Sequence, residues 1–211
     1  AAFLGVGAYA HSYFLGIGVP FLLSLAISVL FSSLIGMLLA IPALRVTGIY
    51  LAVATLAFSI IVEQILSHWV SVTGGYRGML VPDPYIGNLS LISLSTFYFV
   101  CLAFLLLSIL IAINILRSPL GRAMTAVRDS EISAQSVGIN LARIKTIAFA
   151  ISAGFTGLAG GLLAHKIGYL APDGFNLLVS IQLLLMVVVG GLGSLHGAVY
   201  GAIFIGFCEK N

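Results

Sequence analysis

Charged residues are scarce in this chain. Aspartate, glutamate, lysine and arginine together make up 7% of its 211 residues, whereas a soluble domain has about 25%. So few charges cannot cover a surface that faces water, and 61% of the residues are hydrophobic. The net charge of +3 is small and the basic residues are concentrated in one segment, which argues against the broad basic surface of a nucleic-acid-binding protein. The composition therefore predicts a protein whose apolar surface faces lipid.

Sequence motifs for nucleotide binding and catalysis are also missing. The chain has no G-x-x-x-x-G-K-[ST] motif, so it does not bind ATP through a P-loop. It has no G-x-S-x-G motif and no paired carboxylates that would indicate hydrolysis. We expect no metal or cofactor, because the four histidines lie in separate segments, where isolated side chains at the membrane interface are favoured over a metal site. These histidines are His11, His68, His165 and His196.

The two cysteines do not indicate disulfide bonds, and both ends of the sequence lie in apolar stretches. Cys101 and Cys208 both lie in apolar runs, which favours buried, reduced thiols and implies no disulfide framework. Ala1 opens inside an apolar stretch without an initiator methionine, and Asn211 follows directly on another apolar stretch. We therefore expect the sequence to be truncated at both ends.

Several apolar runs are long enough to suggest helices that cross a membrane, which need about 20 mostly apolar residues. The runs are uninterrupted rather than alternating, which favours helices over a barrel. The predicted fold class is all-α, a polytopic transmembrane helix bundle forming a single domain. The expected spans cover about residues 1–15, 20–43, 48–69, 96–116, 146–165, 176–190 and 197–208.

The basic residues indicate the orientation of this bundle, because lysine and arginine favour the cytoplasmic side. If the spans alternate, the side that contains residues 117–145 has the larger share of them. That side has Arg45, Arg117, Arg122, Arg128, Arg143 and Lys145, the other has Arg77 and Lys166, and Lys210 is unassigned. We therefore expect residues 117–145 to face the cytoplasm, and residues 70–94 and 166–175 to be external.

The basic segment 117–145 has a helical pattern of its own. Ser118-Pro119 is typical of a helix start, and Gly138 and Asn140 suit a helix end, where a left-handed residue is needed. One or two short amphipathic helices at the membrane surface are predicted. The segment is either a solvated connector that only fixes topology or a helix that docks in a partner's groove. The expected apolar face consists of Ala123, Val127, Ala134 and Val137, whose spacings superpose.

Five sequence segments, in chain order, carry a family resemblance. They are AFLGVGAY at 2–9, GIYLAVATLAF at 48–58, SPLGR at 118–122, AVRDSEISAQSVGIN at 126–140 and SIQLLLMVVVGGLGS at 180–194. Together they resemble the branched-chain amino-acid (LivM-type) permeases of ATP-binding-cassette importers, and the resemblance covers essentially the whole chain. It implies that segment 117–145 is the cytoplasmic coupling-helix loop of that family, and that about two N-terminal spans and the C-terminal end lie outside this sequence.

The resemblance also implies partners and functional residues. In the family this loop contacts two cytoplasmic ATP-binding subunits, so ATP is bound by partners. A second related permease subunit and an external, periplasmic substrate-binding protein are the other implied partners. Gln182 stands where the family often has glutamate, which leaves a polar side chain in the span without its charge. The residues carried over to the coupling role are Arg122, Arg128, Asp129, Glu131, Ala134 and Gly138.

The third expected span has a polar stripe. Gly48, Ala52, Thr55, Ser59 and Glu63 follow one another at steps of four, three, four and four residues, so they share one narrow face. Small and hydroxyl residues permit close packing of helices in lipid, and a carboxylate inside an apolar run is a functional candidate. This face, with Gln182, either borders the substrate path or is a packing surface whose Glu63 reaches the outer interface.

Glycine stripes suggest close helix packing near the end of the sequence. Gly157 and Gly161 are four residues apart, as are Gly193, Gly197 and Gly201. The run Gly190-Gly191-Leu192-Gly193 is alternatively the end of a discontinuous helix, as found at transporter sites.

The leading hypothesis is a permease subunit in the inner (plasma) membrane of a bacterium or archaeon, which moves branched-chain or other small apolar amino acids. Urea and short amides are alternatives within the family. A self-contained secondary transporter or channel would need intramembrane ionisable pairs, and Glu63 is the only carboxylate well inside an apolar run. An intramembrane enzyme would need a nucleophile or metal constellation, which the sequence does not suggest.

Overall fold

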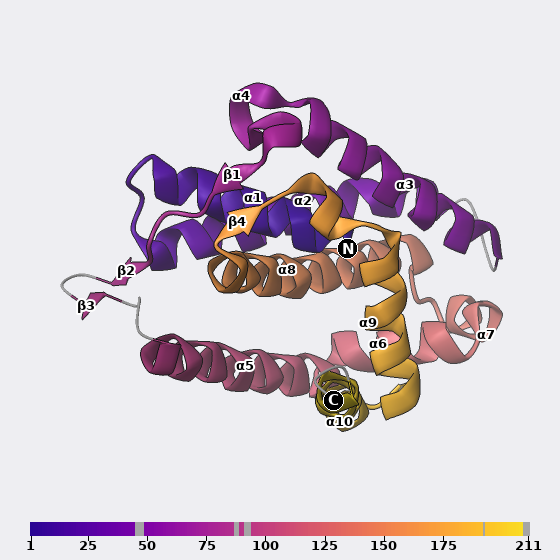
Figure 1. Cartoon of the computed structure of the whole chain (residues 1–211). Coiled ribbons are helices and arrows are strands. Elements are labelled where there is room, and N and C mark those ends of the chain that lie inside the picture. The colour runs from indigo at the N-terminus through magenta and orange to yellow at the C-terminus, as the bar shows by residue number, and fades with distance from the viewer. Residues whose placement is uncertain (45–48, 87–88, 91–93, 192, 209–211) are drawn as a thin grey trace.

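The computed structural model describes residues 1–44, 49–86, 89–90, 94–191 and 193–208 (Figure 1). Helices dominate these residues, and the strands are two residues long. The helices are α1 (Ala2–Gly16), α2 (Phe21–Ala43), α3 (Ile49–His68), α4 (Val70–Thr73), α5 (Leu94–Arg117), α6 (Pro119–Asp129), α7 (Glu131–Ser136), α8 (Leu141–Ile167), α9 (Leu177–Gly190) and α10 (Leu195–Cys208), with 3-10 turns η1 (Gly75–Arg77) and η2 (Pro172–Phe175). The strands are β1 (Met79–Leu80), β2 (Tyr85–Ile86), β3 (Leu89–Ser90) and β4 (Tyr169–Leu170).

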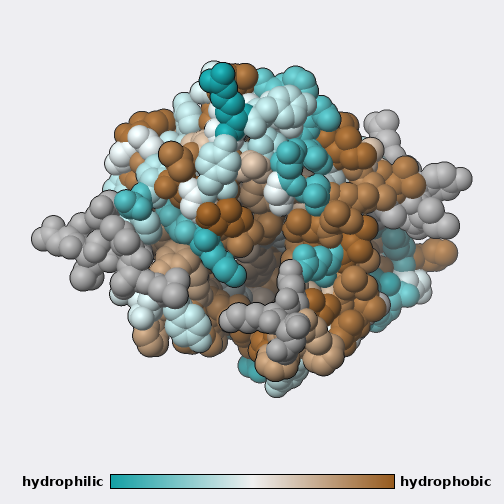
Figure 2. All heavy atoms as spheres, viewed as in Figure 1, coloured by the Kyte–Doolittle hydropathy of each residue, from teal (hydrophilic) through white to brown (hydrophobic). Residues whose placement is uncertain are grey.

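Several of these helices are long and apolar enough to cross a membrane, which confirms the predicted fold class. Among the described residues, the apolar helical stretches are Phe21–Pro42, Ser95–Arg117, Leu141–Ile167 and Pro172–Gly190. A fifth is added if α3 and the α4–η1 segment, which are bent by 75° at Trp69, count as one span. Large hydrophobic side chains such as Leu30, Leu38 and Leu110 are 60% or more exposed, and hydrophobic residues cover much of the face in Figure 2.

The centre of the bundle is formed by α1, α2 and α8, which lie side by side in Figure 1. One face of α2 consists of serines, and Ser24, Ser28 and Ser32 are fully buried. This face packs on glycines of α8: a Cβ at Gly157 would lie 2.6 Å from Ser32 Cβ. Because lipid provides little hydrophobic drive for helix association, such small residues let backbones approach and gain van der Waals contacts. The Gly157 and Gly161 stripe is therefore a packing surface.

The two segments that the sequence places outside the cell lie next to each other. β1 pairs with β4 in antiparallel register, with Met79 opposite Leu170 and Leu80 opposite Tyr169. Phe175, in η2, is 3% exposed and packs against Tyr9, with ring centroids 6.0 Å apart. This end of the bundle is therefore covered by chain from both segments.

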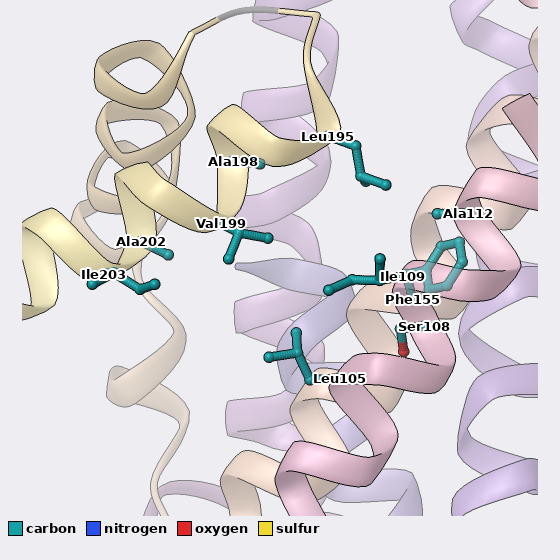
Figure 3. A pocket seen from close by; sticks show the side chains of 10 residues that line it. All are labelled: Leu105, Ser108, Ile109, Ala112, Phe155, Leu195, Ala198, Val199, Ala202 and Ile203. Carbon is teal, nitrogen blue, oxygen red and sulfur yellow. The ribbon is translucent and has the colours of Figure 1, made fainter.

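The last two helices pack on each other through glycine. In Figure 1 the axis of α9 runs across the axes of α5 and α8, and α9 ends beside α10. A Cβ at Gly190 would overlap the carbonyl oxygen of Gly197. An apolar cleft of about 520 Å³ separates α10 from α5 and α8, and its walls include Ile109, Phe155 and Val199 (Figure 3). No residue of the Ser95–Arg117 stretch is buried, so α5 presents its apolar sides to its surroundings.

Candidate functional site

The segment between α5 and α8 forms two short helices whose ends are capped locally. Ser118 begins α6, and its Oγ accepts a hydrogen bond from Gly121 N–H at 3.3 Å. Ser130 has an extended backbone, ends α6 and begins α7, where its Oγ accepts a hydrogen bond from Ser133 N–H at 3.2 Å. Serine at these positions stabilises a helix because its side chain satisfies a backbone donor that has no partner within the helix. Hydrogen bonds between serine side chains and the neighbouring backbone therefore determine where the two helices begin.

Gly138 makes the sharp turn that ends α7. Its φ is +82°, and the amides of Gly138 and Ile139 donate to the carbonyls of Gln135 and Ala134, which is the Schellman arrangement. The expectation that Asn140 also takes a left-handed helix-end conformation was wrong. Asn140 has φ −78° and begins α8, because its Oδ1 accepts a hydrogen bond from Arg143 N–H at 3.1 Å.

The predicted common apolar face of this segment was also wrong. Val127 and Ala134 are 8% and 2% exposed, but Val137 is 74% exposed. Val137 is the C-cap residue of α7, which ends at Ser136, so the three-residue spacing from Ala134 does not keep it on the buried face of one continuous helix. Ala134, one of the predicted coupling residues, packs inside the chain. Two large apolar side chains lie at the surface here: Ile132 of α7, which is 84% exposed, and Val137, which follows α7. Their apolar character in an otherwise polar segment is the sequence signal that could have identified them.

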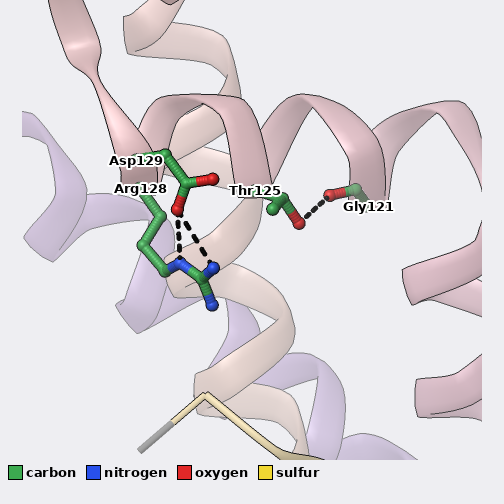
Figure 4. A network of polar contacts seen from close by, with 4 residues as sticks. All are labelled: Gly121, Thr125, Arg128 and Asp129. Atoms are coloured by element: carbon green, nitrogen blue, oxygen red, sulfur yellow. Dashed lines mark hydrogen bonds and ion pairs between the residues drawn. The ribbon is translucent and has the colours of Figure 1, made fainter.

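Charged side chains form two ion pairs in and beside helices α6 and α7. Lys145 of α8 forms an ion pair with Glu131 of α7, with Nζ 2.8 Å from Oε1. Arg128 donates two hydrogen bonds to Asp129 Oδ1 at 3.0 and 3.1 Å, and both side chains are exposed (Figure 4). Between α6, α7 and α8 lies a cavity of about 350 Å³, whose lining includes Met124 and these four charged residues. Arg122 is exposed and donates to Arg117 O.

The structure brings the predicted helix break next to this segment. α9 ends at Gly190 and α10 begins at Leu195, with φ +107° at Gly191 and +90° at Gly193. A Cβ at Gly193 would lie 3.1 Å from Arg128 Nη1. Arg128 is thus beside the turn between α9 and α10, although 65 residues separate the two positions in the chain.

The stripe on the third span borders a second cavity, of about 210 Å³. Thr55 and Ser59 of α3 line it, and Ser180 of α9 lies across from them, so three hydroxyl side chains meet there. Ala1 also lines it, and its amino group donates a hydrogen bond to Ser180 Oγ at 2.8 Å. The other lining side chains are apolar or aromatic: Ala2, Phe3, Leu39, Leu56, Phe58 and Phe149. Glu63 and Gln182 are half-buried and are not among the lining residues. Gly48 lies outside the described residues.

Two of the histidines meet in the interior, so the expectation of four isolated interface histidines was wrong. His11 is fully buried, and its Nε2 lies 2.8 Å from the Nε2 of His165. The contact joins residues 154 apart in sequence and follows from the close packing of α1 on α8 at Gly7 and Gly157. His68, by contrast, is exposed. Among the described residues no three histidine, cysteine or acidic side chains gather as they would at a metal site.

The amino-acid sequence matches the model of one known protein family. The family model described as "Branched-chain amino acid transport system / permease component" matches residues 1–211. The chain belongs to this family. No solved structure matches the chain.

Relatives within the family are similar over most of the chain. The permease protein LivM of the high-affinity branched-chain amino acid transport system of Salmonella typhimurium is 35% identical over 96% of the chain and 54% of its own length. Escherichia coli LivM has the same identity and coverage, and Escherichia coli LivH is 30% identical over 68% of the chain and 49% of its own length. The chain thus spans about half the length of these relatives.

Gly138 allows a first test of the loop, by changing it to alanine. A Cβ at Gly138 would meet nothing within 4 Å, so the cost is the left-handed backbone alone, about 1–2 kcal/mol. We expect Gly138→Ala to loosen the turn between α7 and α8 and to expose residues 131–140 to faster amide hydrogen exchange. Gly174→Ala is the control, because it also meets no atom within 4 Å and lacks a positive φ. Equal exchange in both variants would contradict the structural role of Gly138.

Proposed function

We propose that this chain is the membrane-spanning permease subunit of an ATP-binding-cassette importer in the inner membrane of a bacterium or archaeon. Family membership supports this function, as do the apolar helices. The observation that carries it is the pair of capped helices α6 and α7, which presents Ile132 and Val137 between two long apolar helices. Such a helix with exposed apolar side chains suits the groove of a partner protein.

The proposed partners follow from this arrangement. Two cytoplasmic ATP-binding subunits would dock at α6 and α7, since the chain has no P-loop sequence of its own. A second, related permease would complete the pathway, and an external binding protein would deliver solute at the β1–β4 side. The contact between Arg128 and the α9–α10 turn supports a route by which docking moves the membrane helices.

Branched-chain or other small apolar amino acids are the proposed solutes. The cavity lined by Thr55, Ser59 and Ser180 supports them, because its hydroxyls can hydrogen-bond a polar end while the phenylalanine and leucine walls accept an apolar side chain. Its volume of about 210 Å³ suits a small molecule rather than a peptide.

The test of this function is reconstitution. The full-length protein, its partner permease, the two ATP-binding subunits and the binding protein are placed in liposomes, and uptake of labelled leucine is measured with and without ATP. We expect uptake only with ATP and binding protein present. Uptake by the full-length protein alone, without ATP hydrolysis, would instead indicate a secondary transporter or channel.

Filling the α3 cavity should impair uptake without preventing assembly. Ser59 is 9% exposed and lines the cavity, so Ser59→Leu would place its larger side chain in that space. We expect leucine uptake to fall about tenfold, which corresponds to about 1.4 kcal/mol, while the complex still assembles and hydrolyses ATP. Ser108→Leu on α5 is the matched control, since Ser108 lines the separate apolar cleft. Unchanged uptake in Ser59→Leu would remove this cavity from the pathway.

A further inference from the structure

The buried contact between His11 and His165 has a fixed hydrogen-bond direction. Ser24 Oγ lies 2.7 Å from the carbonyl oxygen of His11 and 2.9 Å from His11 Nδ1. A serine hydroxyl has one proton, and the carbonyl can only accept, so that proton goes to the carbonyl. The ring nitrogen Nδ1 must therefore donate its proton to Ser24 Oγ.

This assignment determines the protonation of both rings. A neutral imidazole has one donor nitrogen and one acceptor nitrogen, so Nε2 of neutral His11 is the acceptor. Nε2 of His165, which lies 2.8 Å away, must then be the donor. The hydrogen bonds run from His165 to His11, then to Ser24, and they join α8, α1 and α2 where α1 ends and α8 ends.

The surroundings do not compensate an added charge. Phe21 stands edge-on to His11, with ring centroids 5.3 Å apart, and the Phe97 ring of α5 lies 5.9 Å from His165. The sequences of α1, α2, α5 and α8 contain no aspartate or glutamate. The titratable groups on the other elements that pack against α1 are Glu63 and His68 of α3 and Asp173 of η2. The other titratable groups of α1, α2, α5 and α8 near this end are Tyr9, which donates to Leu170 O, Tyr13, Tyr98, Cys101 and Lys166.

A second proton on His11 would have to occupy Nε2. Two N–H groups would then face each other across the contact, and no carboxylate of these helices is present to neutralise the new charge. The paired arrangement thus binds fewer protons than the separated one, so its stability falls as the pH falls.

We propose that His11, Ser24 and His165 form a proton-sensitive latch, which holds α1, α2 and α8 together while Nε2 of His11 carries no proton and releases them when His11 is protonated. Its release would loosen the end of the bundle next to the β1–β4 pair, and so make the conformation of this end depend on the pH of the side it faces. The latch does not depend on which solute the protein carries.

Distance measurements between spin labels test the latch in the full-length protein in lipid nanodiscs. Labels are attached at Ile17→Cys and Ile167→Cys, which follow α1 and end α8 and are 63% and 52% exposed, after the native cysteines have been replaced. We expect the distance between the labels to be single and short at about pH 8, and longer and broader at about pH 4, on either side of the usual histidine pKa of about 6.5. The change should reverse when the pH is restored.

Two amide variants separate titration from packing. Glutamine at either position keeps a donor and an acceptor and can rotate to match its neighbour, so His11→Gln and His165→Gln should both keep the short distance and lose the change with pH. If one of them fails to fold, the other gives the same reading. His68→Gln, at an exposed histidine, should retain the change. A distance that is constant with pH in the native protein, or a change that persists in both amide variants, would overturn the proposal.

Discussion

Replacing Gly7 with leucine is expected to prevent stable packing of the bundle. Gly7 lies where α1 crosses α8, and a Cβ there would overlap the carbonyl oxygen of Gly157 and lie 2.5 Å from its Cα. Those atoms belong to backbone, which cannot rotate away as a side chain can. Even Gly7→Ala should cost about 1–3 kcal/mol by overpacking, and Gly7→Leu more, because α1 would have to leave α8 altogether.

Thermal unfolding of the full-length protein in detergent measures this effect. Gly206→Ala is the matched control, because Gly206 also lies within a helix and a Cβ there would meet nothing within 4 Å. Alanine is the better helix former by about 1 kcal/mol, so the control should be as stable as the native protein or slightly more stable. Similar midpoints for Gly7→Ala and Gly206→Ala would show that α1 does not pack on α8 at this crossing.

Reversing the charge of Glu131 is expected to uncouple ATP hydrolysis from uptake. The Glu131–Lys145 pair joins α7 to α8, and its side chains are 43% and 19% exposed. The pair itself contributes about 1 kcal/mol or less, because Glu131 is partly in water. Glu131→Lys, however, places two ammonium groups against each other and displaces α7, which presents Ile132 and Val137. We expect leucine uptake to fall at least about tenfold, equal to about 1.4 kcal/mol, with membrane insertion and ATP hydrolysis retained.

A charge swap distinguishes this effect from general damage. The double variant Glu131→Lys with Lys145→Glu restores an ion pair between the same two helices, so it should recover much of the uptake. Uptake and ATP hydrolysis are measured together in the reconstituted complex. Normal ATP-linked uptake in the single variant would count against a coupling role for α7, and a swap that recovers nothing would indicate that Glu131 acts on a partner rather than through Lys145.

Local signals predicted much of the loop but not its outer surface. Serine, proline and glycine act on their own neighbouring backbone, so a start at Ser118 and a turn at Gly138 could be read from the sequence. The start of α7 at Ser130 and its end at Ser136 were missed, and with them the exposure of Val137, which lies three residues from the buried Ala134. Which residues of α7 point outward depends on how α7 packs on α8, and that is a tertiary contact. The coupling role of the six predicted residues stays a prediction; they are Arg122, Arg128, Asp129, Glu131, Ala134 and Gly138.

The sequence alone determined that the chain is a polytopic bundle of helices. Uninterrupted apolar runs leave no other way to satisfy the backbone in lipid, and that property depends on each run by itself. Only the tertiary structure decided that His11 meets His165, that Arg128 lies beside Gly193, and that Thr55 and Ser59 share a cavity with Ser180. These contacts join positions far apart in the chain, and each depends on how closely two helices approach. That approach is set by the glycines and serines at their crossings, whose partners cannot be read from either helix alone.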